Sequence, residues 1–219
     1  MRIARASSGD TLVLEGGREV RLAGVQAPAP DAPWGEAARA GLEHLATGRR
    51  ADLLYGGKAD DGEGRGLAHV RVADGAWLQA AVLERGLARV RPRSGEAALV
   101  PEMLAHEARA RVRGRGLWSE AAYRVRLPDE FDWETRGLQI VEGRVRRVTR
   151  RSRTVYLDFA ETYRGSVSAE LPVRSLPAWR AAGLEPESLR SRLVRVRGEA
   201  EGFHLTVSGP ESLELLKGR

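Results

Sequence analysis

The chain has 219 residues, enough for one large domain or two small ones, and its 42% hydrophobic and 30% charged residues are typical of a globular protein. It contains no cysteine, which excludes disulfides, thiolate zinc sites and thiol nucleophiles. The formal net charge is +6 and the excess is arginine. Because arginine favours bidentate contact with phosphates, we expect a polyanionic partner.

The positive charge is concentrated in the second half of the chain. Residues 138–219 hold 15 Lys and Arg against 10 Asp and Glu, a net charge of +5, which leaves 21 against 20 for residues 1–137. No apolar stretch approaches the roughly 20 residues that span a bilayer, so we expect a soluble protein without a transmembrane helix. Residues 1–10 lack the apolar segment of a signal peptide. A cytoplasmic location and, for a chain whose leader has been removed, an exported one both stay open.

The first half of the chain alternates between strand-like and helical patterns. Two alternating runs within residues 11–25 flank a Gly-Gly turn, which predicts a β-hairpin. Apolar residues at helical spacing predict an amphipathic helix over 34–47, with Gly48 as its stop. We also expect a strand pair (50–55 with 67–72), a second helix (77–87) and a basic third helix (99–117).

The second half begins after an aperiodic, acidic stretch with one proline, so we expect a linker at residues 124–138 between domains 1–123 and 139–219. Alternation then predicts five strands and one short helix: 141–149, 154–160, 166–171, the helix 177–182, 193–200 and 203–208. Five strands with a helix between the third and fourth is the element order of an OB-fold barrel, which usually binds single-stranded nucleic acid or oligosaccharide. The expected fold class is therefore α+β, mainly β.

Three motifs in the first half share their order and spacing with a known family: residues 8–12 (SGDTL), 20–29 (VRLAGVQAPA) and 61–68 (DGEGRGLA). They resemble the D-G-D-T, R-L-x-G-I-D-x-P-E and D-x-Y-G-R-x-L-A motifs of staphylococcal-nuclease-like thermonucleases. The resemblance covers about residues 1–123. It implies an OB-type five-stranded barrel with three helices and a calcium-dependent nuclease site for DNA or RNA.

The resemblance also implies roles for single residues. In family members that cut nucleic acid, two aspartates hold a calcium ion on the scissile phosphate, a glutamate assists the attacking water, and two arginines hold the phosphate charge. Asp10 corresponds to one metal aspartate, and Arg21 and Arg65 correspond to the two arginines. Gln26 replaces the other metal aspartate, and Ala29 replaces the catalytic glutamate.

These replacements change the expected chemistry. Gln26 offers a carbonyl oxygen but no charge, and calcium affinity depends on the number of carboxylates. Ala29 has no proton acceptor, and general-base help is worth about 100- to 10,000-fold where it operates. We therefore expect weak Ca²⁺ binding at Asp10, with or without Gln26, and weak or no phosphodiesterase activity. An active nuclease whose metal site is rebuilt with Asp31 or Glu36 is the alternative.

The second half offers a dense cationic feature on its first expected strands. It contains six arginines: Arg144, Arg146, Arg147, Arg150, Arg151 and Arg153. They predict phosphate contact with DNA or RNA, preferentially single-stranded. The alternative is that these arginines are simply solvated and protect the edge of the sheet from pairing with another strand. A third hypothesis is a scaffold that binds protein or polysaccharide. Aromatic residues of this half are either stacking platforms or core residues: Tyr156, Phe159, Tyr163 and Phe203.

Overall fold

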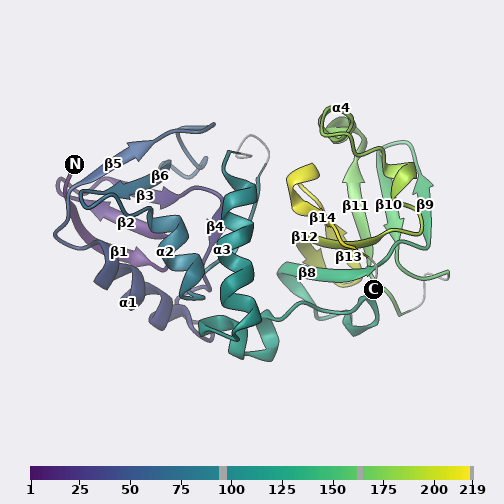
Figure 1. Ribbon diagram of the computed structural model, residues 1–219, viewed down its shortest axis with the longest axis horizontal. Helices are drawn as coiled ribbons and strands as arrows, with labels where there is room; N and C mark the ends of the chain where they lie inside the picture. Colours follow the sequence, from purple (N-terminus) through teal and green to yellow (C-terminus); the bar gives the residue numbers. More distant parts are fainter. Residues whose placement is uncertain (94–97, 162–164, 218–219) are drawn as a thin grey trace. The chain divides into compact units, whose positions relative to one another are not determined.

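The computed structural model describes residues 1–93, 98–161 and 165–217, which fold as two compact units, Met1–Tyr123 and Arg124–Arg219 (Figure 1). Tyr163 lies outside the described residues. None of the helices in the described ranges is long and apolar enough to span a membrane.

The first unit is built on a five-stranded sheet. Its strands are β1 (Ile3–Ser8), β2 (Thr11–Leu14), β3 (Glu19–Leu22), β5 (Ala51–Leu54) and β6 (Gly66–Val72), in the order β1-β2-β3-β6-β5. All neighbours are antiparallel except β3 and β6. A bridge between Arg2 and Arg50 joins the chain before β1 to the chain before β5, so the two edges of the sheet meet.

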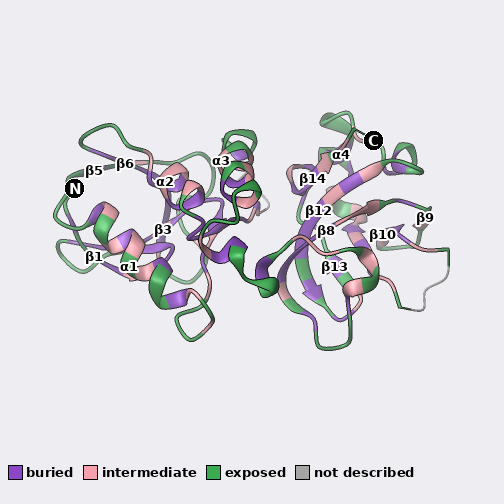
Figure 2. Cartoon of the chain, turned by 60° about the horizontal axis from the view of Figure 1, so that its bottom comes forward, coloured by how far each residue is buried: buried purple, intermediate pink, exposed green. Residues whose placement is uncertain are grey.

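Three helices and a small strand pair complete the first unit. They are α1 (Gly35–Ala46), α2 (Leu78–Glu84), α3 (Val100–Val112) and the pair β4 (Val25–Gln26) with β7 (Arg89–Val90). The helix expected over 34–47 is confirmed as α1, along which buried and exposed residues alternate (Figure 2). Its buried residues are Gly35, Ala38, Leu42 and Ala46, whereas Ala37, counted in the predicted apolar spacing, is exposed. The third helix ends at Val112 rather than at residue 117, because Gly114 takes a left-handed conformation that stops an α-helix.

His69 is a buried histidine of β6, with 5% of its surface exposed and its ring centroid 5.6 Å from that of Trp77. Burial lowers the pKa of His69 below its usual value of about 6.5. The unfolded chain therefore binds this proton more readily than the folded chain does. His69 therefore makes its full contribution to stability when the pH is above its usual pKa. That contribution is lost as the pH falls through the pKa that His69 has in the folded protein.

This burial predicts a measurable pH dependence. We expect His69→Phe, which keeps a ring against Trp77, to remove a slope of up to about 1.4 kcal/mol per pH unit from the unfolding free energy below pH 6.5. Urea denaturation at a series of pH values between 5 and 8 measures it. The matched control is His44→Phe, the same exchange at an exposed position of α1. An equal slope in wild type and His69→Phe would contradict the prediction.

The described residues of the second unit form seven strands and one α-helix. They are β8 (Arg136–Arg144), β9 (Arg147–Arg150), β10 (Thr154–Asp158), β11 (Ser168–Pro172), α4 (Leu176–Ala181), β12 (Leu193–Glu201), β13 (His204–Thr206) and β14 (Leu213–Leu215). The path runs β14-β12-β13-β11-β10-β9, and β8 also pairs with β12. Only β11 and β13 are parallel. Trp179 of α4 is fully buried in the core.

The expected strand 141–149 is two strands that share a corner. β8 pairs with β12, whereas β9 pairs with β10. At the corner, the Val145 N–H bonds to the Arg192 carbonyl and the Arg146 N–H bonds to the Asp158 carbonyl, so the chain changes partner within two residues. Residues 141–149 alternate without interruption, so the sequence gives no signal that the pairing partner changes within them.

Residues 124–138, expected to be a linker, lie within the second unit. Phe131 is 4% exposed and belongs to its core, and Arg126 forms a parallel bridge with Val141. β8 begins at Arg136, inside the same stretch. The acidic residues that suggested a linker fold locally instead, as Glu130 pairs with Arg124 at 2.8 Å.

Both units use the same strand order. If β8 and β9 count as one strand, each unit has the order first, second, third, fifth, fourth, with the third and fifth strands parallel. A helix lies between the third and fourth strands in each: α1 in the first unit and α4 in the second. The second unit thus repeats the topology of the first.

Candidate functional site

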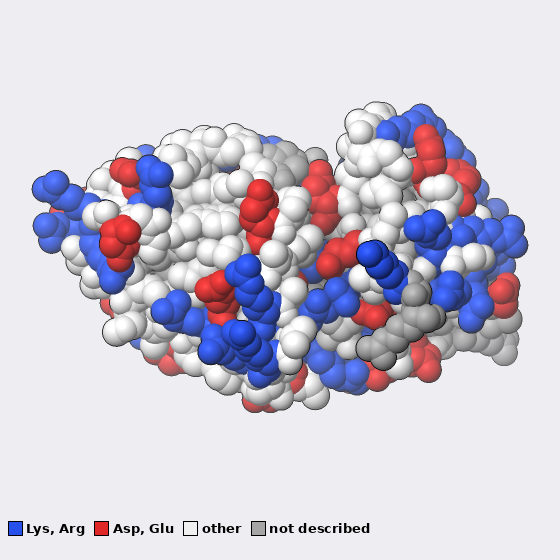
Figure 3. All heavy atoms as spheres, viewed as in Figure 1, with Lys and Arg blue, Asp and Glu red and all other residues white. Residues whose placement is uncertain are grey.

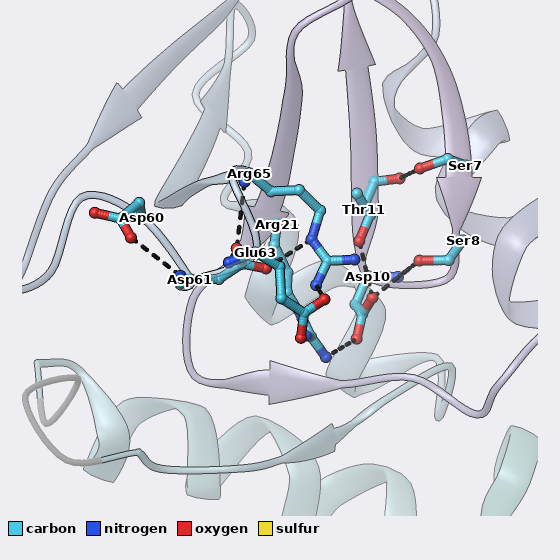
Figure 4. Close-up of polar contacts among 10 residues, drawn as sticks. Ser7, Ser8, Asp10, Thr11, Arg21, Asp60, Asp61, Glu63 and Arg65 are labelled. Atoms are coloured by element: carbon cyan, nitrogen blue, oxygen red, sulfur yellow. Dashed lines mark hydrogen bonds and ion pairs between the residues drawn. The ribbon is translucent and has the colours of Figure 1, made fainter.

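Asp10 is a buried carboxylate in the turn between β1 and β2, with 6% of its surface exposed. Four donors reach it: the hydroxyl groups of Ser8 (2.9 Å) and Thr11 (3.1 Å) at Oδ1, and Arg21 Nη2 (3.3 Å) and the Ala27 N–H (3.1 Å) at Oδ2 (Figure 4). A carboxylate has about four lone-pair sites, so these four hydrogen bonds occupy the acceptor sites of Asp10.

The hairpin register places Arg21 beside Asp10. The Gly-Gly turn predicted from sequence joins β2 to β3, and Thr11 pairs directly opposite Arg21. The Arg21 side chain is only 14% exposed and forms an ion pair with Asp10 at 3.3 Å. The charge of this arginine is therefore largely balanced within the fold.

Arg65 is held by two acids of its own loop. Its Nε donates to Asp61 Oδ2 and its Nη2 donates to Glu63 Oε2, each at 2.6 Å. Burial would raise the pKa of Asp61, but hydrogen bonds from the Glu63 N–H and from Arg65 outweigh it and hold that pKa below its usual value. Burial opposes the charge of Arg65 in the same way, and the contact with Asp61 nevertheless raises its pKa.

The structure brings together the three residues that match the nuclease motifs. Figure 4 shows Asp10, Arg21 and Arg65 converging from the β1–β2 turn, β3 and the loop before β6. Two acids of that loop, Asp61 and Glu63, lie beside Arg65. Sequence reasoning missed their pairing with Arg65, although the spacing Asp61-x-Glu63-x-Arg65 was its available signal.

The metal set implied by the resemblance does not fit calcium here. Gln26 Oε1 is buried and lacks a hydrogen-bond partner among the described residues, but the carboxylate of Asp10 already accepts four donors. Ala29 is exposed and carries no acid. Calcium takes six to eight oxygen ligands, several of them carboxylates. In residues 1–93, 98–161 and 165–217, no three His, Asp or Glu side chains gather to hold a metal.

Within the described part of the chain, neither acid proposed to rebuild the site bonds to the groups around Asp10. Glu36 lies on the exposed side of α1 and pairs with Arg39 at 2.7 Å. The hydrogen bonds from Arg39 lower the pKa of Glu36, which keeps this carboxylate paired and ionised. Asp31 is exposed in the segment before α1. Neither residue belongs to the set of groups around Asp10.

Five of the six arginines predicted on the second unit are exposed. Arg144 ends β8, Arg146 lies at the corner, Arg150 ends β9, and Arg151 and Arg153 follow in the turn before β10. Figure 3 shows Lys and Arg side chains gathered over the part of this unit that carries β9. Of these five, Arg150 has a distant partner, Glu187 at 3.8 Å. This surface retains positive charge for an anionic partner.

Arg147 differs from its neighbours. It is partly covered, and its Nε donates to Asp158, a residue 3% exposed, at 3.1 Å. Asp158 also accepts the hydroxyl groups of Thr149 and Ser168. Arg147 therefore holds β9 to β10, and the lone acid within the apolar run of β10 was the sequence signal for this role. Of the aromatic residues considered as stacking platforms, Phe159 belongs to the hydrophobic core, and Phe203 is partly buried and packs against that core.

Residues 19–120 match the family model described as staphylococcal nuclease homologue. The first unit carries a staphylococcal nuclease homologue domain. Its barrel is of the OB type, and the chain as a whole is α+β with a second β-rich unit. Arg21 and Arg65 fall inside the match, whereas Asp10 precedes it. Members of this family bind nucleic acids, which indicates a nucleic-acid-related function. A search of curated proteins finds no match to the chain.

Proposed function

We propose that this protein binds single-stranded DNA or RNA and cleaves it weakly or not at all. The observation that carries the proposal is the saturated carboxylate of Asp10, which stands without a second acid at Gln26 or Ala29. A metal-assisted hydrolase needs an open metal position and a group that takes a proton from water. In its described residues no three His, Asp or Glu side chains gather to hold a metal, and Gln26 and Ala29 stand at the positions that the resemblance gives to a metal aspartate and the general base.

The binding charge lies mainly on the second unit. Arg21 and Arg65 are each paired with acids, whereas Arg146, Arg151 and Arg153 are exposed. The repeated strand order supports an OB-like assignment of this unit, a fold often used to bind single strands. Phosphate contact through these arginines would make the affinity fall steeply with salt.

The test measures binding and cleavage in the same samples. A 5′-fluorescein 20-mer, as DNA or RNA, is titrated with the full chain between 50 and 200 mM NaCl, with EDTA or with calcium, and the products are separated on gels. We expect binding in EDTA, a steep salt dependence and intact oligonucleotide. Calcium-dependent cleavage that is lost in Arg65→Ala would establish the active-nuclease alternative instead. Salt-independent or absent binding would favour the protein or polysaccharide scaffold.

Glu63 competes with a phosphate for Arg65. We expect Glu63→Gln to leave the bond from Arg65 Nε to Asp61 intact and to remove the negative charge beside Nη2. Oligonucleotide binding should then tighten about 2- to 5-fold, the range set by the worth of one exposed ion pair. Fluorescence anisotropy at 50 mM salt measures the change.

A control separates this effect from net charge. Glu15→Gln removes an equally exposed acid of the first unit, which pairs with Arg2 at 3.6 Å. It should change the affinity less than Glu63→Gln. Equal gains in the two variants would show that Arg65 does not contact the nucleic acid.

A further inference from the structure

The second unit contains a pocket of about 460 Å³ beside the corner between β8 and β9. Its apolar side chains are those of Leu127, Pro128, Phe159, Ala160 and Leu193. Its charged side chains are those of Arg144, Arg146, Asp129 and Glu142, of which Glu142 is paired with Arg195. The volume lies in the range of small-molecule sites, which combine apolar walls with a few polar groups. A flat apolar group with an attached anion suits this lining.

Three polar groups of the pocket have unused hydrogen-bonding capacity. Ser166 Oγ is buried and has no hydrogen-bond partner among the described residues. The Arg146 side chain is exposed and makes no ion pair within the described ranges. Arg144 is held in place, since its Nη1 donates to the Ser191 carbonyl at 2.6 Å and its other N–H groups remain for a ligand. The pocket thus presents donors at its wall and at its rim.

A second hollow of about 380 Å³ adjoins this pocket. It shares Arg144 and Leu193 with the pocket and adds Arg192 and Lys217. Apolar space and positive charge therefore alternate along the surface, from the pocket through Arg144 to the second hollow. A single strand of nucleic acid has the same alternation of bases and phosphates, and base stacking in such sites tolerates any sequence.

We propose that the pocket holds one unpaired base of a single strand, with its flanking phosphates on Arg146 and Arg144 and the next phosphate beside Arg192 and Lys217. This deepens the proposed function and rests on it. Asp129, which also lines the pocket, is placed to accept a hydrogen bond from a base amino group. A paired base inside a duplex cannot enter, so the site selects single strands.

The test compares oligonucleotides of equal charge with and without bases. Oligo-dT of ten nucleotides and an abasic strand of the same length are titrated with the full chain, and the two affinities are expected to differ by about 10-fold, the effect of one stacked base. The exposed rim variant Leu127→Asp should reduce that difference to about 2-fold or less. The variant Arg146→Gln should weaken binding of both strands.

The matched control is Arg174→Gln, at an exposed position of the same unit outside the pocket. It should weaken binding less than Arg146→Gln. A decamer with one 4-thiothymidine, irradiated and analysed by mass spectrometry, should crosslink to residues of the pocket.

The failures are distinguishable. If the chain binds oligo-dT and the abasic strand equally, or if Arg174→Gln matches Arg146→Gln, the pocket proposal is overturned while nucleic-acid binding stands. If no oligonucleotide binds, both proposals fall. If polyglutamate competes as well as oligo-dT does and is weakened by Leu127→Asp, the pocket takes an acidic peptide and the assigned ligand is wrong.

Discussion

Replacing Asp10 with alanine is expected to lower the unfolding free energy of the nuclease homologue domain by about 3–5 kcal/mol, the cost of breaking a buried ion pair by removing one partner. The change leaves Arg21, with 14% of its side chain exposed, and the buried Ala27 N–H without their acceptor. Urea denaturation of the full chain, followed by circular dichroism and fitted as two transitions, measures the loss.

The control for this prediction is Asp31→Ala, which removes an exposed acid from the same domain and should change stability by about 0.5 kcal/mol or less. Asp10→Asn should fall between the two, because an amide keeps one accepting oxygen but loses the charge. The interpretation of Asp10 as a structural residue fails if Asp10→Ala is as stable as wild type and has lost calcium-dependent cleavage.

The second large effect is expected from the exposed arginines of the second unit. Changing Arg144, Arg146, Arg150, Arg151 and Arg153 together to glutamine should weaken single-strand binding on the order of 100-fold at 50 mM salt. Each phosphate contact that is lost should also make the log–log salt slope shallower by about 0.7. Anisotropy titrations at several salt concentrations give both quantities.

A charge-matched control uses five exposed arginines of the first unit: Arg5, Arg49, Arg50, Arg85 and Arg113. Their replacement by glutamine lowers the net charge by the same amount, so a smaller loss of affinity and a smaller change of slope are expected. Equal effects in the two sets would mean that total charge, rather than the surface around β8 and β9, determines binding. Arg147 is left unchanged in both sets because it holds Asp158.

Local patterns predicted the local elements well. The hairpin of β2 and β3 follows from its alternation and its Gly-Gly turn, and α1 follows from its apolar spacing. β1 was not predicted, since its residues become a strand only by pairing with β2 and packing under α1. The parallel pairing of β3 with β6 joins segments more than 40 residues apart, and no local signal records it.

The residues of the candidate site could be predicted from the sequence, whereas several of their contacts could not. Motif spacing pointed to Asp10, Arg21 and Arg65, which lie together. The donor from Ala27 was beyond sequence reasoning because it is a backbone group, placed only once the chain after β4 turns back over Asp10. The bond from Arg65 to Glu63 was missed for a different reason, since Glu63 stands where the D-x-Y-G-R-x-L-A motif has tyrosine, so the resemblance assigns it no role.

The parallel pairing in each unit has a consequence for biosynthesis. A sheet that joins its third strand to its fifth must close a long loop before that contact stabilises anything, which makes folding slow compared with helical bundles. Each unit nevertheless draws all of its strands from one continuous stretch of chain. At about 5–20 residues per second, the ribosome needs roughly 5–20 s to synthesise residues 124–219. The nuclease homologue domain therefore has that interval to complete its barrel before synthesis of residues 124–219 is finished, which limits mispairing between two sheets of the same topology.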